Sequence, residues 1–413
     1  MKIDFSMLRE PYQALFTSGR TYAAFDKDSI IPLIDELKEY ELIADPMAGF
    51  GSLMIWCAQR GISTYNIEYN PPTYLWGILN NPTFSDSISL VVNELISNKF
   101  KFPSNNKRFA ISNSWYSPES YEIIMDLYSN IYRTTSKYFT SNAEEISLAI
   151  LIPFVGRLSC YVPGNIVANV KRGGICLFDS LPQDFQTYLC SLENRINIIN
   201  PTFINKEHEF VFGDLRKTEI PRKLSAFITS PPYPNSRDYY KMFGPENDCI
   251  LYLKEKGNIE DYTVEEQLIS CVSVSKYVNK NIDYSSDIVS SSARDFIRYI
   301  KNYNGTRQAK YDNKVYYVPY YTSYFFHIEQ AYRNFSKYLT DRCDGFIILT
   351  NNTARNKTIP VAESIMEFFQ SLDFNAEIVD KYTRELSHVG SINPRVKGFK
   401  AKHMEYTIKV SRR

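Results

Sequence analysis

The chain contains a stretch that predicts a strand, a tight turn and the start of a helix in immediate succession: Leu42-Ile43-Ala44-Asp45-Pro46-Met47-Ala48-Gly49-Phe50-Gly51-Ser52. Its apolar start indicates a buried strand that ends at the acidic side chain of Asp45. Gly49 and Gly51 let the backbone approach a ligand closely, and the helix that follows offers backbone N–H groups at its N-terminus. This order of elements predicts an α/β fold with a ligand site at the turn.

A second acidic residue ends the next expected strand. It is Glu68, seventeen residues after Gly51, in the stretch Tyr65-Asn66-Ile67-Glu68-Tyr69-Asn70-Pro71-Pro72. A surface glutamate without a ligand is the simplest interpretation. Its position after an apolar strand and before Asn-Pro-Pro favours a carboxylate that binds a ribose hydroxyl.

A third motif stands far along the chain, Phe227-Ile228-Thr229-Ser230-Pro231-Pro232-Tyr233. The apolar residues indicate the end of another buried strand, and the two prolines then stop the strand pairing because they donate no N–H. Such a loop presents a hydroxyl, fixed carbonyls and a flat ring, which suit a planar group with an exocyclic amine. Alone the motif is weak, and a loop that only ends a strand is the alternative.

Together these motifs resemble those of the DNA amino-methyltransferases, which use S-adenosylmethionine to methylate an exocyclic base nitrogen. The resemblance covers residues about 10–80 and about 208–413 by motif order. Ser at the first catalytic position is typical of the N4-cytosine branch, and the cofactor loop precedes the catalytic loop without permutation. The cofactor loop Asp-Pro-x-x-Gly-x-Gly-Ser/Thr is matched by Asp45, Pro46, Met47, Gly49, Phe50, Gly51 and Ser52. The catalytic loop (Asp/Asn/Ser)-Pro-Pro-(Tyr/Phe) is matched by Ser230, Pro231, Pro232 and Tyr233.

The resemblance implies a Rossmann-like S-adenosylmethionine-dependent methyltransferase fold. Its sheet is expected to be mixed and mostly parallel, with a helical insertion and a DNA-recognition region added. It also implies direct in-line methyl transfer to N4 of a cytosine flipped out of duplex DNA. Ser230 and the Pro231 carbonyl then accept the amine hydrogens while Tyr233 stacks on the base. Asp214, at the end of another strand fifteen residues before Thr229, would receive the cofactor's adenine amino group.

The expected cellular setting follows from the same resemblance. The cofactor is S-adenosylmethionine, no metal is expected, and the partner is duplex DNA. A cognate restriction endonuclease is a functional rather than physical partner, since the natural role is the modification half of a restriction-modification system. A solitary methyltransferase fits equally. The expected location is the prokaryotic cytoplasm, at the nucleoid through DNA.

The motif order divides the chain into five expected regions. The segments 1–80, 206–245 and 326–413 form the methyltransferase domain, with the cofactor loop, the catalytic loop and a basic C-terminal loop respectively. The segment 81–205 is expected to be a mainly helical insertion, with helices beginning near Ser117 and Ser141, and 173–178 as a strand or hairpin edge. The polar segment 246–325 is the expected target-recognition insertion, although a packing insertion is the alternative.

Composition agrees with a soluble globular protein. The chain has 413 residues, 44% hydrophobic and 23% charged, with a net charge of +1. The sequence has no run of 18 apolar residues and no leader pattern, so neither a membrane span nor a signal peptide is expected. The seven cysteines form no C-x-x-C pair, and the four histidines are dispersed. A zinc site or disulfide framework is therefore not expected.

Basic residues concentrate near the C-terminal end. Residues 381–413 hold nine Lys or Arg against two Glu, which suits a phosphate contact. A solvated tail is the alternative. A helix is expected at 325–339, and the last two strands at 374–379 and 405–410. The segment from Arg384 to Lys402 is expected to be a basic hairpin or loop between these two strands. The candidate DNA contacts are Asn235, Arg237, Arg384, Arg395 and Lys397.

Three alternatives stay open at this point. The acceptor could be N6 of adenine, which Ser230 opposes, or an exocyclic amine in RNA. A non-catalytic DNA-binding relative is opposed by the joint presence of Asp45, the glycine turn and residues 230–233. C5-cytosine methylation is excluded because it needs a thiolate nucleophile and the chain has no Pro-Cys dipeptide.

Overall fold

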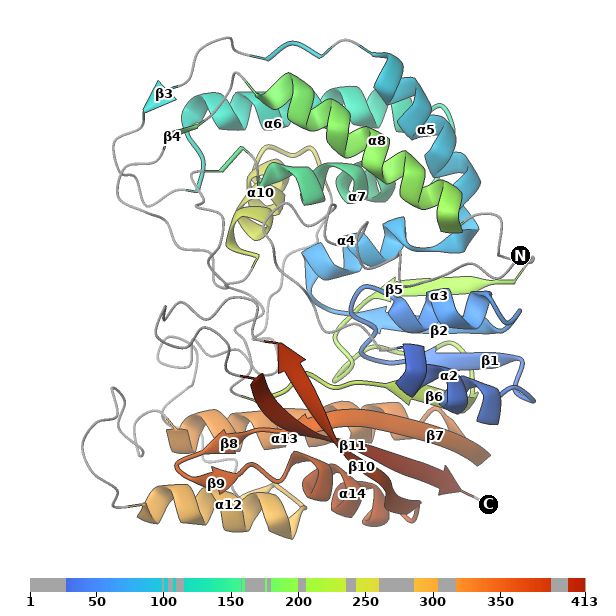
Figure 1. Ribbon diagram of the computed structural model, residues 1–413, viewed down its shortest axis with the longest axis vertical. Helices are drawn as coiled ribbons and strands as arrows, with labels where there is room; N and C mark the ends of the chain where they lie inside the picture. Colours follow the sequence, from blue (N-terminus) through green and yellow to red (C-terminus); the bar gives the residue numbers. More distant parts are fainter. Residues whose placement is uncertain are drawn as a thin grey trace.

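The computed structural model has a seven-strand central sheet of order β10-β11-β7-β6-β1-β2-β5 (Figure 1). Strand β11 runs antiparallel to both neighbours, and the other pairings in this sheet are parallel. The strands are β1 (Leu42–Asp45), β2 (Ser63–Glu68), β5 (His208–Phe212), β6 (Leu224–Thr229), β7 (Leu339–Asn351), β10 (Asn375–Ser387) and β11 (Lys400–Arg412). The structure describes residues 27–98, 100–102, 107–108, 115–156, 158–159, 175–176, 180–199, 206–234, 243–259, 286–303, 317–387 and 400–412. The predicted α/β class with a mixed, mostly parallel sheet is confirmed.

The strand order reverses between β1 and β6. From β1 the chain adds β2 and then β5 toward one edge, and it returns to place β6 on the other side of β1. Ala44 of β1 lies opposite Phe227 of β6 in the parallel register. In open α/β sheets ligands bind at the carboxyl ends of the strands at such a reversal, so the sheet itself points to the ends of these two strands.

Helices cover both faces of the central strands. On one face α2 (Lys27–Glu36) and α3 (Ser52–Ala58) bury Ile30, Ile34 and Trp56 against Ala226 and Ile228. The other face is covered by α12 (Ser291–Asn302), α13 (Val318–Ser336) and α14 (Val361–Gln370), whose apolar sides surround Phe227. Burial on both sides explains why β6 reads as a nearly continuous apolar run.

A separate helical layer occupies the opposite end of the long axis from α12–α14 (Figure 1). Its central helix is α7, in which every residue from Ile146 to Val155 is buried. The layer joins the sheet through α4, where Gly77 faces the Phe210 ring of β5. The helices around α7 are α4 (Pro71–Leu79), α5 (Ser85–Ser97), α6 (Pro118–Thr135), α8 (Leu181–Ile199) and α10 (Gly244–Glu255), with a short 3-10 turn, η2 (Pro82–Phe84).

Several predicted elements are confirmed in the helical layer. Helix α6 begins after Ser117, whose hydroxyl accepts the Ser120 N–H at 3.0 Å, and α7 begins at Ala143. Within the predicted strand 173–178, Ile175–Cys176 forms β4, which pairs antiparallel with β3 (Lys107–Arg108). The described part of 81–205 is therefore mainly helical.

Three predicted boundaries are wrong. The helix expected at 325–339 is α13, which starts at Val318 and ends at Ser336, and β7 begins at Leu339. The loop expected from Arg384 to Lys402 starts inside β10, because that strand and β11 pair from Asn375↔Ser411 to Ser387↔Lys400. The final strand, expected at 405–410, is correspondingly longer. Hydrogen bonding between the two backbones extends both strands beyond the apolar residues from which the sequence predicts them.

The segment expected to recognise DNA also contributes to the core. In 246–325 the described helix α12 buries Ala293, Phe296, Ile297 and Ile300 among residues of α13 and α14. No helix in the described ranges has the length and apolarity needed to cross a membrane.

Candidate functional site

The candidate site lies where β1 and β6 end, at the reversal of strand order. Asp45 is the last residue of β1 and Thr229 the last residue of β6. The Thr229 hydroxyl donates to Asp45 Oδ1 at 2.8 Å. This bond joins two motifs that are 184 residues apart in the sequence, so the glycine turn and the loop 230–233 leave the sheet side by side.

Asp45 is fully buried, and only one of its carboxylate oxygens has a partner among the described residues. Oδ1 accepts from Thr229 and from the Met47 N–H at 3.2 Å. Oδ2 makes no hydrogen bond to any residue in the described part of the chain. Burial raises the pKa of Asp45 to about 7, although both hydrogen bonds act to lower it. A buried carboxylate oxygen without a partner is costly, and a cationic group bound at this point would satisfy it.

The glycine turn adopts the conformation that its sequence predicts. Gly49 has φ 55° and Gly51 has φ 75°, values that glycine reaches without steric cost. A Cβ on Gly49 would meet no atom within 4 Å, whereas one on Gly51 would lie 2.8 Å from the Met54 side chain. Gly49 therefore leaves open space beside the backbone, and Gly51 provides close packing.

Glu68 holds this turn to the end of β2. Its Oε2 accepts the Gly49 N–H at 2.8 Å, and its Oε1 accepts the N–H groups of Tyr69 and Asn70 at 3.0 and 2.7 Å. Burial raises the pKa of Glu68 to about 7, against the effect of these three bonds. The side chain retains partial exposure. It shapes the turn, and its Oε2 accepts only the Gly49 N–H among the described residues.

The loop after β6 is held by two side chains from other elements. Tyr324 of α13 donates to the Pro232 carbonyl at 3.0 Å, and Asn352, after β7, donates to the Pro234 carbonyl at 2.8 Å. Within the loop the Ser230 Oγ and Tyr233 hydroxyl lie 2.7 Å apart. The hydroxyl and the aromatic ring predicted for the site thus lie together on a braced loop.

Tyr332 of α13 was not identifiable from the sequence. Its side chain is fully buried, and its hydroxyl makes no hydrogen bond with the residues that the structure describes. Its pKa lies well above the ordinary value, first because of burial and then because Asp45 and Tyr233 are near. The helical pattern places Tyr332 in a helix but does not tell which buried ring lies behind the site. Tyr324 and Asn352 carry no local motif either.

The remaining predicted cofactor residues are placed less directly. Asp214 follows β5, as expected, but its carboxylate is engaged by the Arg216 side chain, with Nη2 to Oδ2 at 2.6 Å. Phe50 is buried, with its ring 5.2 Å from that of Trp76. Pro46 and Met47 lie in the turn itself, and Ser52 is the first residue of α3.

The predicted DNA contacts stay predictions. Asn235, Arg237, Arg395 and Lys397 lie outside the described residues. Arg384 belongs to β10, where its backbone pairs with His403, and its side chain is not among those described.

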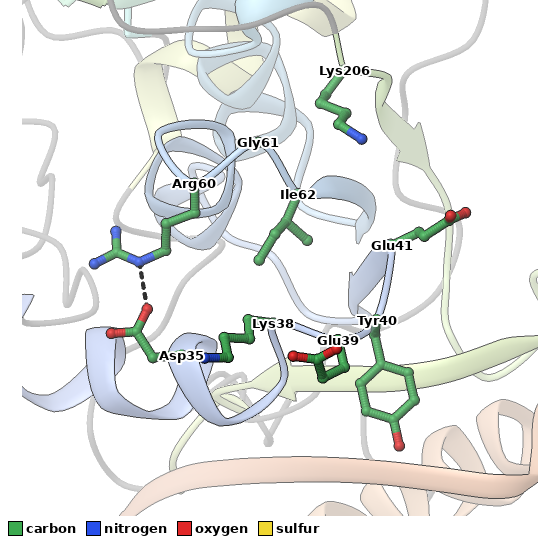
Figure 2. A pocket seen from close by; sticks show the side chains of 9 residues that line it. All are labelled: Asp35, Lys38, Glu39, Tyr40, Glu41, Arg60, Gly61, Ile62 and Lys206. Atoms are coloured by element: carbon green, nitrogen blue, oxygen red, sulfur yellow. Dashed lines mark hydrogen bonds and ion pairs between the residues drawn. The ribbon is translucent and has the colours of Figure 1, made fainter.

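A pocket of about 350 Å³ lies at the opposite edge of the sheet (Figure 2). Lys38 and Glu41 precede β1, Ile62 precedes β2 and Lys206 precedes β5, so the pocket is at the amino ends of these strands. Its rim carries an Arg60–Asp35 ion pair of 2.9 Å. This pocket is remote from the reversal of strand order at the carboxyl ends.

The described residues contain no cluster of three or more His, Cys, Asp or Glu side chains that could hold a metal ion. Comparison of the chain with known protein families, curated proteins and solved structures gives no match.

Proposed function

We propose that the protein is an S-adenosylmethionine-dependent methyltransferase that modifies the exocyclic N4 of cytosine in duplex DNA. The observation that carries this proposal is the Thr229–Asp45 hydrogen bond, which brings the Asp-Pro-x-x-Gly-x-Gly-Ser turn beside Ser-Pro-Pro-Tyr. The sheet supports it, since both motifs stand at the carboxyl ends of adjacent strands where the order reverses. The finer assignment to a methyltransferase fold, and to a restriction-modification system, is part of the proposal.

The residues of the glycine turn suit the cofactor. The unpartnered Oδ2 of Asp45 fits the ammonium of its amino-acid end, because a buried carboxylate is stabilised by a cation. The open space at Gly49 allows the cofactor to lie against the backbone. Glu68 presents its carboxylate at the end of β2, where a ribose hydroxyl is bound in related sheets. When bound, the cofactor supplies a methyl group on a sulfonium, which is already activated for transfer.

The loop 230–233 suits a flipped base with an exocyclic amine. The N4 amine of cytosine is a weak nucleophile, since its lone pair is delocalised into the ring. Ser230 Oγ and the Pro231 carbonyl accept the amine hydrogens and so favour the nitrogen geometry in which positive charge develops. Tyr233 stacks on the base, and the base must leave the duplex to reach it. The bond between Ser230 and Tyr233 fixes the hydroxyl relative to the ring.

The proton lost from the amine can pass to Ser230 or to water after transfer. A strong base is therefore not required, in keeping with a site built from hydroxyl, carboxylate and carbonyl groups. Tyr324 and Asn352 contribute by holding the carbonyls of Pro232 and Pro234. Rigid positioning of the acceptor is a large part of catalysis when no covalent intermediate forms.

The decisive experiment is transfer of labelled methyl from S-adenosylmethionine to mixed-sequence duplex DNA, followed by nucleoside analysis. We expect N4-methylcytosine from the wild type and at least a 100-fold lower rate from Ser230→Ala. Ser97→Ala, which changes an exposed serine at the end of α5, is the matched control and keeps the wild-type rate.

Other products would change the proposal in defined ways. N6-methyladenine would keep the fold and the site but overturn Ser230 as an indicator of cytosine. Labelled RNA without labelled DNA would move the acceptor to RNA. Cofactor binding without transfer to either nucleic acid would support a non-catalytic DNA-binding role.

A further inference from the structure

A short hairpin follows β7 at the edge of the sheet that carries the candidate site (Figure 1). It consists of β8 (Thr353–Ala354) and β9 (Lys357–Thr358), paired antiparallel, and is called here the β8–β9 hairpin. Its six residues include two cations and no acidic residue. The buried side chains of Ala354 and Ile359 anchor it to the core under α12–α14.

Both cations lie over tyrosine rings of α12 and the start of α13. The Arg355 guanidinium is 4.5 Å from the centre of the Tyr317 ring and 5.9 Å from that of Tyr303. The Lys357 ammonium is 4.6 Å from the centre of the Tyr299 ring. These contacts hold both charges in place on the hairpin, since a cation over a ring face is attracted by the ring quadrupole. Lys357 is exposed and has no ion pair in the described part of the chain.

The backbone of the turn is also fixed. The Tyr299 hydroxyl donates to the Arg355 carbonyl at 2.8 Å, and the Asn356 side-chain Nδ2 donates to the Tyr303 hydroxyl at 3.3 Å. Arg355 and Asn356 have φ of 50° and 62°. Two-residue hairpin turns need such values, and asparagine or glycine usually supplies them. An arginine at the first position is strained, and strain of this kind concentrates at functional sites.

The hairpin is tied directly to the loop 230–233. Asn352, the residue before β8, donates to the Pro234 carbonyl. Along α13, Tyr317 supports Arg355 and Tyr324 bonds the Pro232 carbonyl. Seven residues of helix span about 10 Å. The support of the hairpin and the support of the loop are therefore about 10 Å apart along the same helix.

We propose that the β8–β9 hairpin binds backbone phosphates of duplex DNA near the flipped base, through Arg355 and Lys357. The inference rests on the proposed function and assigns this surface as part of its substrate site. Phosphate contacts of this kind set the position of the protein on the duplex without reading sequence. The tyrosines act by holding the cations.

The test measures the salt dependence of binding to a mixed-sequence duplex by fluorescence anisotropy. Each phosphate contact adds about 0.9 to the slope of log affinity against log salt. The double variant Arg355→Gly/Lys357→Gln should lower the slope by about 1.8. The ratio of the wild-type affinity to the variant affinity then falls about twelvefold between about 50 and about 200 mM salt. Arg355→Gly relieves the strained φ, so weaker binding without loss of stability separates contact from folding.

Lys38→Gln is the matched control, because it removes one exposed lysine at the opposite edge (Figure 2). The proposal requires the control to keep the wild-type slope and the double variant to keep its affinity for S-adenosylmethionine. An unchanged slope in the double variant, or an equal loss in Lys38→Gln, overturns it. If the wild type methylates DNA and the double variant keeps the wild-type slope, only the proposed phosphate contact of the hairpin is rejected. If the wild type binds no DNA, both proposals fall.

Discussion

Asp45 has two properties that are unfavourable in the free protein. Its carboxylate is buried with one oxygen unpartnered, and burial raises its pKa to about 7. Both are unfavourable for stability and both are relieved by a bound cation. A position that is costly in the free protein and satisfied by a ligand is the signature expected of a binding residue rather than of a structural one.

Asp45→Asn should therefore separate binding from stability. We expect the affinity for S-adenosylmethionine to fall about 10- to 100-fold, the effect of removing a charged hydrogen-bond partner. The thermal midpoint of the free protein at pH 8 should not fall, because the variant no longer buries an ionised group. Calorimetric titration and thermal unfolding measure the two quantities. Unchanged affinity would remove Asp45 from the cofactor site.

Thr229→Val tests the bond that joins the two motifs. Loss of the hydroxyl should cost about 1 kcal/mol of unfolding free energy. The same hydrogen bond lowers the pKa of Asp45, so its removal should move the pH midpoint of cofactor binding upward. Thr229→Ser keeps the hydroxyl and should retain the wild-type midpoint. A Thr229→Val midpoint equal to that of the wild type would show that the bond does not tune Asp45.

At this scale the sequence identifies residues that stand in motifs and misses those that support them. Gly49 and Gly51 were predictable because only certain backbone conformations fit a tight turn, and Glu68 because it ends an apolar strand. Tyr332 and Tyr324 lie in a helix whose pattern says that they are buried, not what they touch. The catalytic and cofactor roles themselves stay predictions.

Two elements that are distant in sequence from the loop 230–233 contact it and help to fix its position. Helix α13 reaches it through Tyr324, and the end of β7 reaches it through Asn352. Both donate to carbonyls that precede or follow Tyr233, so each limits movement of the ring. The proline-rich sequence makes the loop stiff, but its position over the site depends on these two donors.

The double variant Tyr324→Phe/Asn352→Ala should loosen the loop without changing the glycine turn. We expect kcat for DNA methylation to fall about 10- to 100-fold, because small misplacement of the acceptor has effects of this size. Affinity for S-adenosylmethionine should not change. Tyr132→Phe, at an exposed tyrosine of α6, controls for loss of a tyrosine hydroxyl. Equal losses of kcat and cofactor affinity would argue against a specific role in the loop.

Helix α4 packs on β5 with no space for a side chain at Gly77. A Cβ there would lie 2.2 Å from the Phe210 ring, so Gly77→Ala should cost about 1 to 3 kcal/mol of unfolding free energy. Phe210→Leu in the same chain should restore part of the loss, which chemical denaturation of the two single variants and the double variant measures. Additive losses would show that the two side chains do not compete for space.

Element boundaries show where local sequence is insufficient. The start of α13 holds Val318, Tyr320, Tyr321 and Tyr324, residue types that favour strands, and packing against α12 and the sheet makes this segment helical. The lengths of β10 and β11 depend on pairing between two distant segments. The beginnings of α6 and α7 were predictable because Ser-Pro-Glu and Ala-Glu-Glu are local signals.

At the level of the whole molecule, strand order creates the site. The motif at 42–52 and that at 227–233 each predict a strand end, but neither states that β1 and β6 are neighbours. The reversal of order between them decides it. The helical layer around α7 has its own core and packs on the β5 side, which leaves the carboxyl edge between β6 and β7 next to the β8–β9 hairpin.

Two buried carboxyl groups, those of Asp45 and Glu68, make the unfolding free energy of the whole chain depend on pH. Asp45 and Glu68 have ordinary pKa values of 3.8 and 4.5, and burial raises both to about 7 in the folded protein. Between these values the folded state holds more protons than the unfolded state. Their contribution to the unfolding free energy therefore falls as pH rises from about 4 to about 7 and levels off above that. For Asp45 a change of about three pKa units corresponds to about 4 kcal/mol at most.

Urea unfolding at pH 5 and pH 8 tests this dependence. The wild type should lose stability relative to Asp45→Asn between these pH values, because the variant lacks the titrating group. S-adenosylmethionine should restore more stability at pH 8 than at pH 5, since its ammonium pairs with the ionised carboxylate and binding stabilises the folded state by mass action. If wild type and variant keep a constant difference across this range, Asp45 titrates near its ordinary pKa and is ionised at both pH values.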